Sequence, residues 1–260
     1  MSLIVPDIRP SVIARINPVA KLVGSILIAI ALLLSIDWVS ALVALALEAV
    51  LLPFSGLSSR QFWLRTATLW FAAPLACLTT VLYGEDSGST LWQWGFVSVT
   101  DGSLSLGLAI ALRILAIGLP GIVLFATTDP TDLADGLGQV LRLPARFVLG
   151  GLAGLRLVGL FIEDWRFLAL ARRARGVGDS NLIVRIARQG FSLLVLSVRR
   201  GSKLATAMEA KGFGSDRPRT WARASVFGWR EWAFVTLAAV IPALAVVAAV
   251  VAGTWKFVLS

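Results

Sequence analysis

The sequence has no histidine and a single cysteine, Cys77, and it lacks the phosphate-binding pattern GxxxxGK[ST]. Without histidine, the chain has no imidazole for acid–base catalysis near neutral pH, and a metal site of His and Cys ligands is close to excluded. One cysteine cannot form a disulfide within the chain. Without a P-loop, we expect any ATP hydrolysis to reside on another polypeptide. The sequence therefore predicts no catalytic residues, no cofactor and no bound metal.

Charged residues are also scarce, at 15% of the chain, whereas 57% of the residues are hydrophobic and the mean hydropathy is +0.83. This composition is too apolar for a soluble domain and is typical of a polytopic membrane protein. Apolar runs long enough to cross the hydrocarbon core as helices predict about five spans. Their approximate ranges are 20–36, 39–53, 66–83, 104–126 and 232–253. The predicted fold class is an all-α polytopic membrane protein.

The few charges are distributed unevenly between the segments that connect these spans. Segment 84–103 contains Glu85, Asp86 and Asp101 and no basic residue, whereas segment 127–231 contains 17 Lys and Arg against 9 Asp and Glu, a net +8. The positive-inside rule then places the N-terminus, the 54–65 loop and segment 127–231 in the cytoplasm, and the acidic segment outside. Five spans put the C-terminus outside, which conflicts slightly with Lys256.

The segment of roughly 100 residues between the fourth and fifth spans is predicted to form two long amphipathic helices. Apolar residues recur at steps of three and four from Pro144 to about Arg175 and again from about Asn181 to Lys211, with basic residues between them. A Gly-Val-Gly-Asp turn at 176–179 joins the two helices, which are expected to lie at or just under the membrane. The predicted domains are a membrane domain (1–126), a cytoplasmic domain that contains the two amphipathic helices (127–231) and a C-terminal transmembrane helix (232–260).

Both amphipathic helices finish on the same pattern, Ala174-Arg175-Gly176 and Ala210-Lys211-Gly212, 36 positions apart. One such end is ordinary helix termination, since glycine accepts the left-handed conformation and a cation suits the helix dipole. Two matching ends on neighbouring helices favour a functional interpretation. A long basic side chain beyond an abruptly ended helix can enter an acidic socket on a partner. Two equivalent ends suggest two equivalent sockets, and hence a dimeric or pseudo-dimeric partner.

Two charged residues fall inside predicted spans, Glu48 in the second and Arg113 in the fourth. A charge inside the membrane indicates function by default, although the two could equally form a structural ion pair or extend toward the interface. Six glycines allow close helix approach and could equally form a sliding surface. They are Gly136, Gly138, Gly150, Gly151, Gly154 and Gly159.

Four motifs, in order along the chain, resemble the transmembrane T component of energy-coupling-factor (ECF) transporters, the family that includes the cobalt and biotin transporter T subunits. INPVAKL (16–22) is similar to the Asn-Pro-x-x-Lys-Leu entry into the first span, and TTDPTDLADGLGQVLRLP (127–144) resembles the Thr-Thr-x-Pro-x-x-Leu segment after the fourth. GLRLVGLFIEDWRFLALARRARG (154–176) looks like the first coupling helix, with its acidic pair Glu163-Asp164. SVRRGSKLATAMEAKGFG (197–214) looks like the second.

The resemblance implies that two cytoplasmic ATPase subunits dock on the tips and that a small membrane-embedded S component captures a vitamin or metal ion. The docking residues would be Ala174, Arg175, Gly176, Ala210, Lys211 and Gly212, with support from Arg172, Arg173, Glu209, Glu163 and Asp164. Lys211 departs from the family pattern, which usually has arginine there, and loses the planar fork that binds a carboxylate bidentately. The expected location is the cell membrane of a bacterium or archaeon, with the lipid bilayer and no nucleic acid among the partners.

Three other classes stay open on the sequence alone. An ion-gradient-driven secondary transporter commonly shows inverted repeats and broken helices, and no convincing repeat relates 20–83 to 104–253. A membrane-bound enzyme needs clustered catalytic groups, whereas the carboxylates here are scattered and histidine is absent. A peripheral scaffold could bind anionic lipid through the basic helices.

Overall fold

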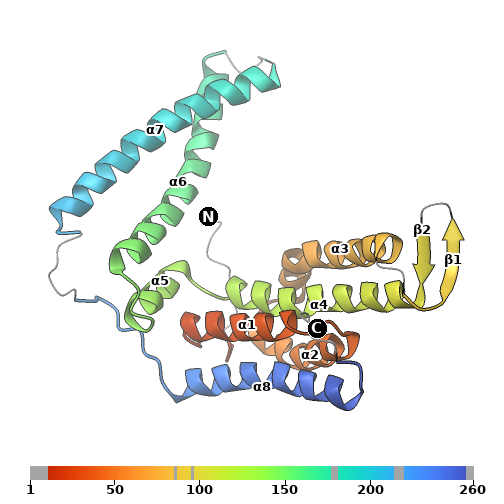
Figure 1. Ribbon diagram of the computed structural model, residues 1–260. Coiled ribbons are helices and arrows are strands. Elements are labelled where there is room, and N and C mark those ends of the chain that lie inside the picture. The colour runs from red at the N-terminus through yellow and green to blue at the C-terminus, as the bar shows by residue number, and fades with distance from the viewer. Residues whose placement is uncertain (1–10, 85–86, 95–96, 177–180, 214–219, 256–260) are drawn as a thin grey trace. The chain divides into compact units, whose positions relative to one another are not determined.

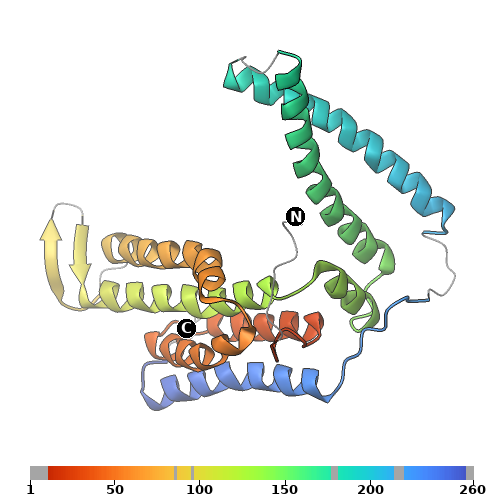
Figure 2. The ribbon, with the colours of Figure 1, turned by 180° about the vertical axis from the view of Figure 1, so that it is seen from behind.

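The computed structural model describes residues 11–84, 87–94, 97–176, 181–213 and 220–255. Glu85, Asp86, most of the predicted 176–179 turn and Lys256 lie outside the described residues. The chain divides into two compact units, a membrane unit (6–136 and 225–260) and a hairpin unit whose main stretch is 137–224. Figures 1 and 2 show most of the described residues in helices, which confirms the predicted fold class.

The membrane unit contains α1 (Pro18–Leu33), α2 (Trp38–Leu51), a short 3-10 helix η1 (Leu52–Ser55), α3 (Ser59–Tyr83), α4 (Asp101–Ala126) and α8 (Trp229–Val251). α4 packs against α1, α2 and α3, and α8 packs against α1 and α2. The core is built from small and aliphatic side chains, which let membrane helices approach closely. Its buried residues are Ile28, Leu32, Ala44, Ala116, Ala238, Ile241 and Ala245, with a second group of Ala73, Leu115 and Leu119.

Polar residues set where these helices begin. The side chain of Asn17 accepts a hydrogen bond from the amide of Val19, and Pro18 occupies the first turn of α1, where its missing N–H costs nothing. Ser58 forms a capping box with Gln61 at the start of α3. These caps satisfy amides that would otherwise lie unpaired in an apolar medium.

The sequence missed two elements. A two-stranded antiparallel hairpin, β1 (Thr90–Trp94) and β2 (Val97–Thr100), occupies the segment predicted as the acidic outer loop. A ten-residue helix, α5 (Pro130–Gln139), follows α4, and the Asp129 carboxylate accepts from the amide of Thr131 at its start. The α5 helix crosses the boundary between the two units, so it is the connection by which the chain leaves the membrane unit.

Five described helices or helix pairs are long and apolar enough to cross a membrane, as the sequence predicted, but the set differs. It consists of α2 with η1, α3, α4, α6 and α8, whereas α1, predicted as the first span, has only 16 residues. At 1.5 Å per residue α1 is about 24 Å long, shorter than the hydrocarbon core of about 30 Å. The first half of α6, in contrast, carries few charges.

The hairpin unit contains α6 (Ala145–Ala174) and α7 (Leu182–Ala210), close to the bounds that periodicity predicted. In both views the two helices run antiparallel and converge at the end of α6, so that they form a V (Figures 1 and 2). No residue of α6 is buried, and in α7 only Gln189 is.

Candidate functional site

The two predicted tips have nearly the same backbone. Arg175 is the C-cap residue of α6 with φ −90° and ψ 5°, and Lys211 is that of α7 with φ −86° and ψ 9°. Gly176 and Gly212 follow with φ 70° and 79°, in the left-handed region that only glycine adopts without strain. All six residues of the two tips are exposed. The shared local sequence thus produces one end geometry twice.

Hydrogen bonds explain why each helix stops where it does. The amide of Gly176 donates to the Arg173 carbonyl at 3.0 Å, and the amide of Gly212 donates to the Glu209 carbonyl at 2.9 Å. At the second end, the amide of Phe213 also donates to the Met208 carbonyl at 2.9 Å, which completes a Schellman motif. Terminal carbonyls are therefore satisfied by the backbone itself. The basic side chains are not needed for capping.

The tips lie at different ends of the hairpin. Arg175 follows α6 at the point where the helices converge, whereas Lys211 follows α7 at its far end (Figure 1). α7 has 29 residues, which corresponds to about 44 Å along its axis. Two partner surfaces several nanometres apart could therefore be engaged at once.

Polar contacts between α6 and α7 hold the two helices together. Asp164 pairs with Arg200, with 2.6 Å between Oδ2 and Nη1. The Gln189 amide nitrogen donates to the Trp165 carbonyl at 2.6 Å, and Gln189 is 3% exposed. Arg172 donates to the carbonyl of Arg188 at 3.2 Å. Hydrogen bonds and one ion pair, made by long polar side chains, thus fix where the two helices meet.

The predicted supporting residues fall into two groups, those that contact the other helix and those whose side chains are exposed. Asp164 and Arg172 take part in the contacts between α6 and α7 and do not extend beyond a tip. Arg173, Glu209 and Glu163 have exposed side chains, the first two directly beside the tips. Arg200 and Gln189 were not predicted as site residues, although their basic or polar character on an apolar helix side is visible in the sequence.

The α6 helix also presents an unpartnered apolar side. Gly150, Gly151 and Gly154 each have no atom within 4 Å of the position that a Cβ would occupy. Large apolar side chains along the same helix are exposed, namely Phe147, Leu155, Val158, Ile162 and Phe167. Gly136 and Gly138 differ, because a Cβ on either would meet Val19 or Trp221 within 2.6 Å. The six glycines therefore do not form one surface.

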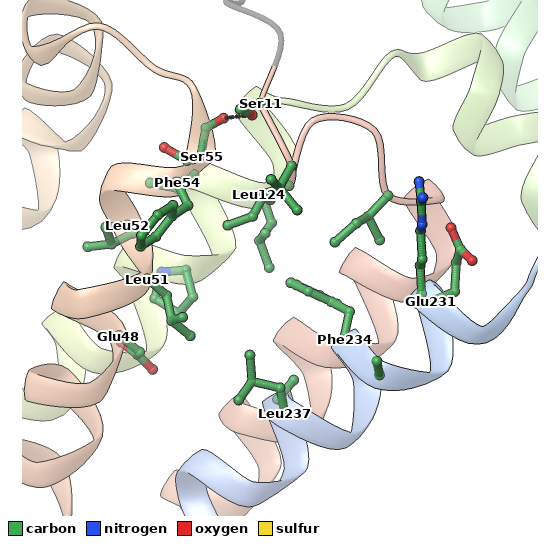
Figure 3. A pocket seen from close by; sticks show the side chains of 18 of the residues that line it. Ser11, Glu48, Leu51, Leu52, Phe54, Ser55, Leu124, Glu231, Phe234 and Leu237 are labelled. Atoms are coloured by element: carbon green, nitrogen blue, oxygen red, sulfur yellow. Dashed lines mark hydrogen bonds between the residues drawn. The ribbon is translucent and has the colours of Figure 1, made fainter.

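Within the membrane unit a cavity of about 870 Å³ lies between α2 and α8, as Figure 3 shows, and Glu48 lies in its wall. Phe234 and Leu237 of α8 line the opposite side. Glu48 is 3% exposed, and within the described part of the chain neither of its carboxylate oxygens has a hydrogen-bond partner. Nη2 of Arg113 is also buried, with no partner among these residues. Among the described residues, Glu48 and Arg113 therefore do not form an ion pair with each other.

A multi-pass α-helical body with an attached helical hairpin defines the chain as an integral membrane protein. The family model of the cobalt transport proteins, CbiQ, matches residues 9–221. The chain therefore belongs to this family, that of the T components of ECF transporters, as its motifs predicted.

Curated relatives agree with this assignment. The energy-coupling factor transporter transmembrane protein EcfT of Limosilactobacillus fermentum is 27% identical over 243 residues, covering 89% of this chain and 90% of the relative. EcfT of Brevibacillus brevis is 28% identical over 262 residues, covering 95% and 94%. EcfT of Bacillus subtilis is 30% identical over 169 residues, covering 60% and 64%. The similarity extends across both units.

Proposed function

We propose that this chain is the energy-coupling subunit of an ECF-type importer, which transmits ATP-driven motion from two cytoplasmic ATPase subunits to an S component that binds a vitamin or metal ion. The observation that carries the proposal is the pair of matching exposed basic helix ends, Arg175 and Lys211, with the same backbone conformation. The names of the EcfT relatives support it independently.

The physical role of each tip is that of a plug. Because backbone hydrogen bonds already satisfy the helix end, the Arg175 guanidinium and the Lys211 ammonium are available to an acidic socket. Arginine can bind a carboxylate through two parallel hydrogen bonds, whereas lysine acts mainly as a point charge. The socket that receives Arg175 is therefore expected to bind it in a fixed orientation, and the socket that receives Lys211 is expected to hold it mainly by charge.

The open side of α6 is assigned to the S component. A helix with no buried residue and with exposed Phe147, Leu155 and Val158 needs an apolar partner, and the uncovered glycines permit a close approach. When the ATPases close on ATP, the tips would move with their sockets, and this side of the hairpin would displace the S component.

We further propose that the hairpin unit and the N-terminus are cytoplasmic and that α6 lies outside the hydrocarbon core. The 16-residue α1, although shorter than this core, then crosses it with local thinning of the bilayer. If α6 crossed the membrane, the strongly basic α7 would lie on the outer side, against the positive-inside rule. The charges in the second half of α6, among them Asp164 and Arg166, also disfavour a full crossing.

Copurification tests the proposal. The tagged chain is co-expressed with candidate ATPase subunits, and ATPase recovered per chain is measured for the wild type and for Arg175→Glu with Lys211→Glu. We expect the double charge reversal to abolish recovery and Lys211→Arg to retain it. Arg166→Glu with Lys203→Glu is the matched control, because both residues are exposed and basic but lie away from the tips. Equal recovery with tip and control variants would reject the plug.

A further inference from the structure

The first turn of α1 contacts the segment through which the chain leaves the membrane unit. The Lys21 ammonium group, 2% exposed, donates to the carbonyl oxygen of Thr127 at 3.0 Å and lies 3.3 Å from its Oγ1. Thr127 is the C-cap of α4, and α5 begins three residues later, at Pro130. Arg65 of α3 donates to the neighbouring Ala126 carbonyl at 2.9 Å. Two cations therefore satisfy the carbonyl end of α4, where the helix dipole favours positive charge.

The same turn contacts the segment through which the chain returns. Oδ1 of Asn17 accepts from the Val19 amide at 3.0 Å, which fixes the orientation of the side-chain amide. Its Nδ2 donates to Oγ of Ser225 and to the carbonyl oxygen of Val226, both at 2.9 Å. Both amide hydrogens and the oxygen of Asn17 are thus used. Ser225 is the first residue of the membrane unit after the hairpin unit.

The outgoing and returning segments meet at this turn. A Cβ on Gly136, the last residue before the hairpin unit, would lie 2.6 Å from Cγ2 of Val19, 3.2 Å from Oδ1 of Asn17 and 3.5 Å from Oγ of Ser225. Beyond the boundary, the two segments stay adjacent, because the Gln139 side chain donates to the Arg223 carbonyl at 2.7 Å.

We infer that Asn17 and Lys21, the α1 anchor, form the joint through which displacement of the hairpin unit reaches the membrane unit. This inference rests on the proposed function. A pull on the hairpin unit acts on the segments at 127–136 and 225–226, and the α1 anchor ties both to one helical turn. Lys21 holds the end of α4 and Asn17 the approach to α8, so all three helices move together. Both are positioning residues, since neither lies at a docking tip.

Asn17→Asp separates this role from folding. Aspartate keeps the oxygen that caps α1, but it has no N–H to donate to Ser225 and Val226. Asn181→Asp is the matched control, because Asn181 also caps its helix, α7, through Oδ1 to the Ile183 amide at 3.3 Å, and its Nδ2 has no partner in the described part of the chain. Lys21→Met is the second variant, since it keeps an apolar stem of similar length and removes the ammonium group.

The experiment uses hydrogen exchange of the complete complex, the chain with its ATPases and S component, with a non-hydrolysable ATP analogue or with ADP. In the wild type and Asn181→Asp, the nucleotide should change exchange in α6 and α7 and also at the ends of α1 and α4. In Asn17→Asp and Lys21→Met, we expect the nucleotide-dependent change in exchange to remain in the hairpin unit. At the ends of α1 and α4 this change should fall about fivefold or more, which is the low end of the range of typical coupling between two sites.

The other possible results of this experiment overturn either the inference or the proposed function. A wild-type response at α1 and α4 in both anchor variants overturns the inference and leaves the proposed function intact. A complex that recovers no ATPase even with the wild-type chain, or whose hairpin unit ignores the nucleotide, overturns the proposed function instead. If Lys21→Met fails to assemble, Asn17→Asp alone decides, because its helix cap is unchanged.

Discussion

The membrane unit and the hairpin unit are both helical and both rich in apolar residues, yet they bury those residues very differently. α4 alone has nine buried residues, whereas α6, which is longer, has none. In the membrane unit, helices pack against one another through small residues, and polar groups such as Lys21 are inside and hydrogen-bonded. In the hairpin unit, the helices meet through a few polar contacts and leave their apolar sides open.

This difference indicates a division of work within one chain. The membrane unit has its own packed core and is expected to move as one rigid unit. The hairpin unit has too little buried surface to be rigid by itself, so its apolar sides need to be covered by another molecule. A unit that transmits motion is expected to have this form, since its contacts have to rearrange more readily than those of a packed core.

The largest expected effect is an all-or-none difference in labelling that separates the two units by side of the membrane. In a Cys77→Ser background, Ala174→Cys at the α6 tip should react with a membrane-impermeant maleimide only from the cytoplasmic side. Leu91→Cys in β1 should react only from outside. Labelling of Ala174→Cys from outside would mean that α6 crosses the membrane, and the comparison of the two units would have to be redrawn.

Leucine in place of glycine should be severely destabilising in one unit and harmless in the other. At Gly107 of α4, a Cβ would lie 2.7 Å from Cγ2 of Val81 and 3.0 Å from the Cys77 carbonyl oxygen, whereas Gly151 of α6 has no neighbour within 4 Å. Overpacking makes Gly107→Leu less stable by about 3 kcal/mol. Thermal unfolding of the purified chain measures this. Equal loss at Gly151→Leu would show that α6 is packed after all.

The buried amide of Gln189 should control how firmly the hairpin is closed. Gln189→Leu removes the donor to the Trp165 carbonyl, and loss of about 1 kcal/mol should speed hydrogen exchange around Trp165 about fivefold. Exchange measured by mass spectrometry on peptides from α6 tests this. Ser197→Ala is the control, since the hydrogen bond that Ser197 makes among the described residues stays within its own helix, at the Leu194 carbonyl. The same exchange rate in both variants would contradict a role in closure.

The Asp164–Arg200 ion pair should make the smallest contribution to the stability of the hairpin. Its side chains are 17% and 34% exposed, so solvent screens the attraction, and a double-mutant cycle with Asp164→Asn and Arg200→Gln should give a coupling of about 0.5–1 kcal/mol. Stability to thermal unfolding supplies the four values. Additive effects of the two substitutions would show that the ion pair forms without stabilising the hairpin.

Much of the fold follows from the sequence because membrane helices have nearly fixed length and the long helices carry clear periodicity. The ends of α6 and α7 were predictable as well, since a glycine after a basic residue is a strong local signal for a left-handed cap. The resemblance to ECF T components identified the family for a different reason, through the order of its motifs.

The rest depends on contacts between distant residues. Asn17, Lys21 and Thr127 are recognisable as parts of motifs, but nothing local indicates that Lys21 donates to Thr127 or that Asn17 reaches Ser225, 208 positions away. Likewise, the sequence left open whether Glu48 and Arg113 form an ion pair, and only the side-chain contacts show that, among the described residues, neither Glu48 oxygen has a partner. The β1–β2 hairpin does not follow from the sequence, because its Thr, Trp and Val residues form only a short signal within a segment whose clearest feature is its acidic charge.

The claim that the two basic tips are gripped by ATPase subunits is tested most directly by photo-crosslinking. A photoreactive amino acid replaces Arg175, Lys211 or, as the control, the exposed Lys203 in the intact complex, which is then irradiated in inverted membrane vesicles. The account predicts that positions 175 and 211 each trap an ATPase subunit and that position 203 does not. Adducts only with lipid or with the chain itself at both tips would contradict it.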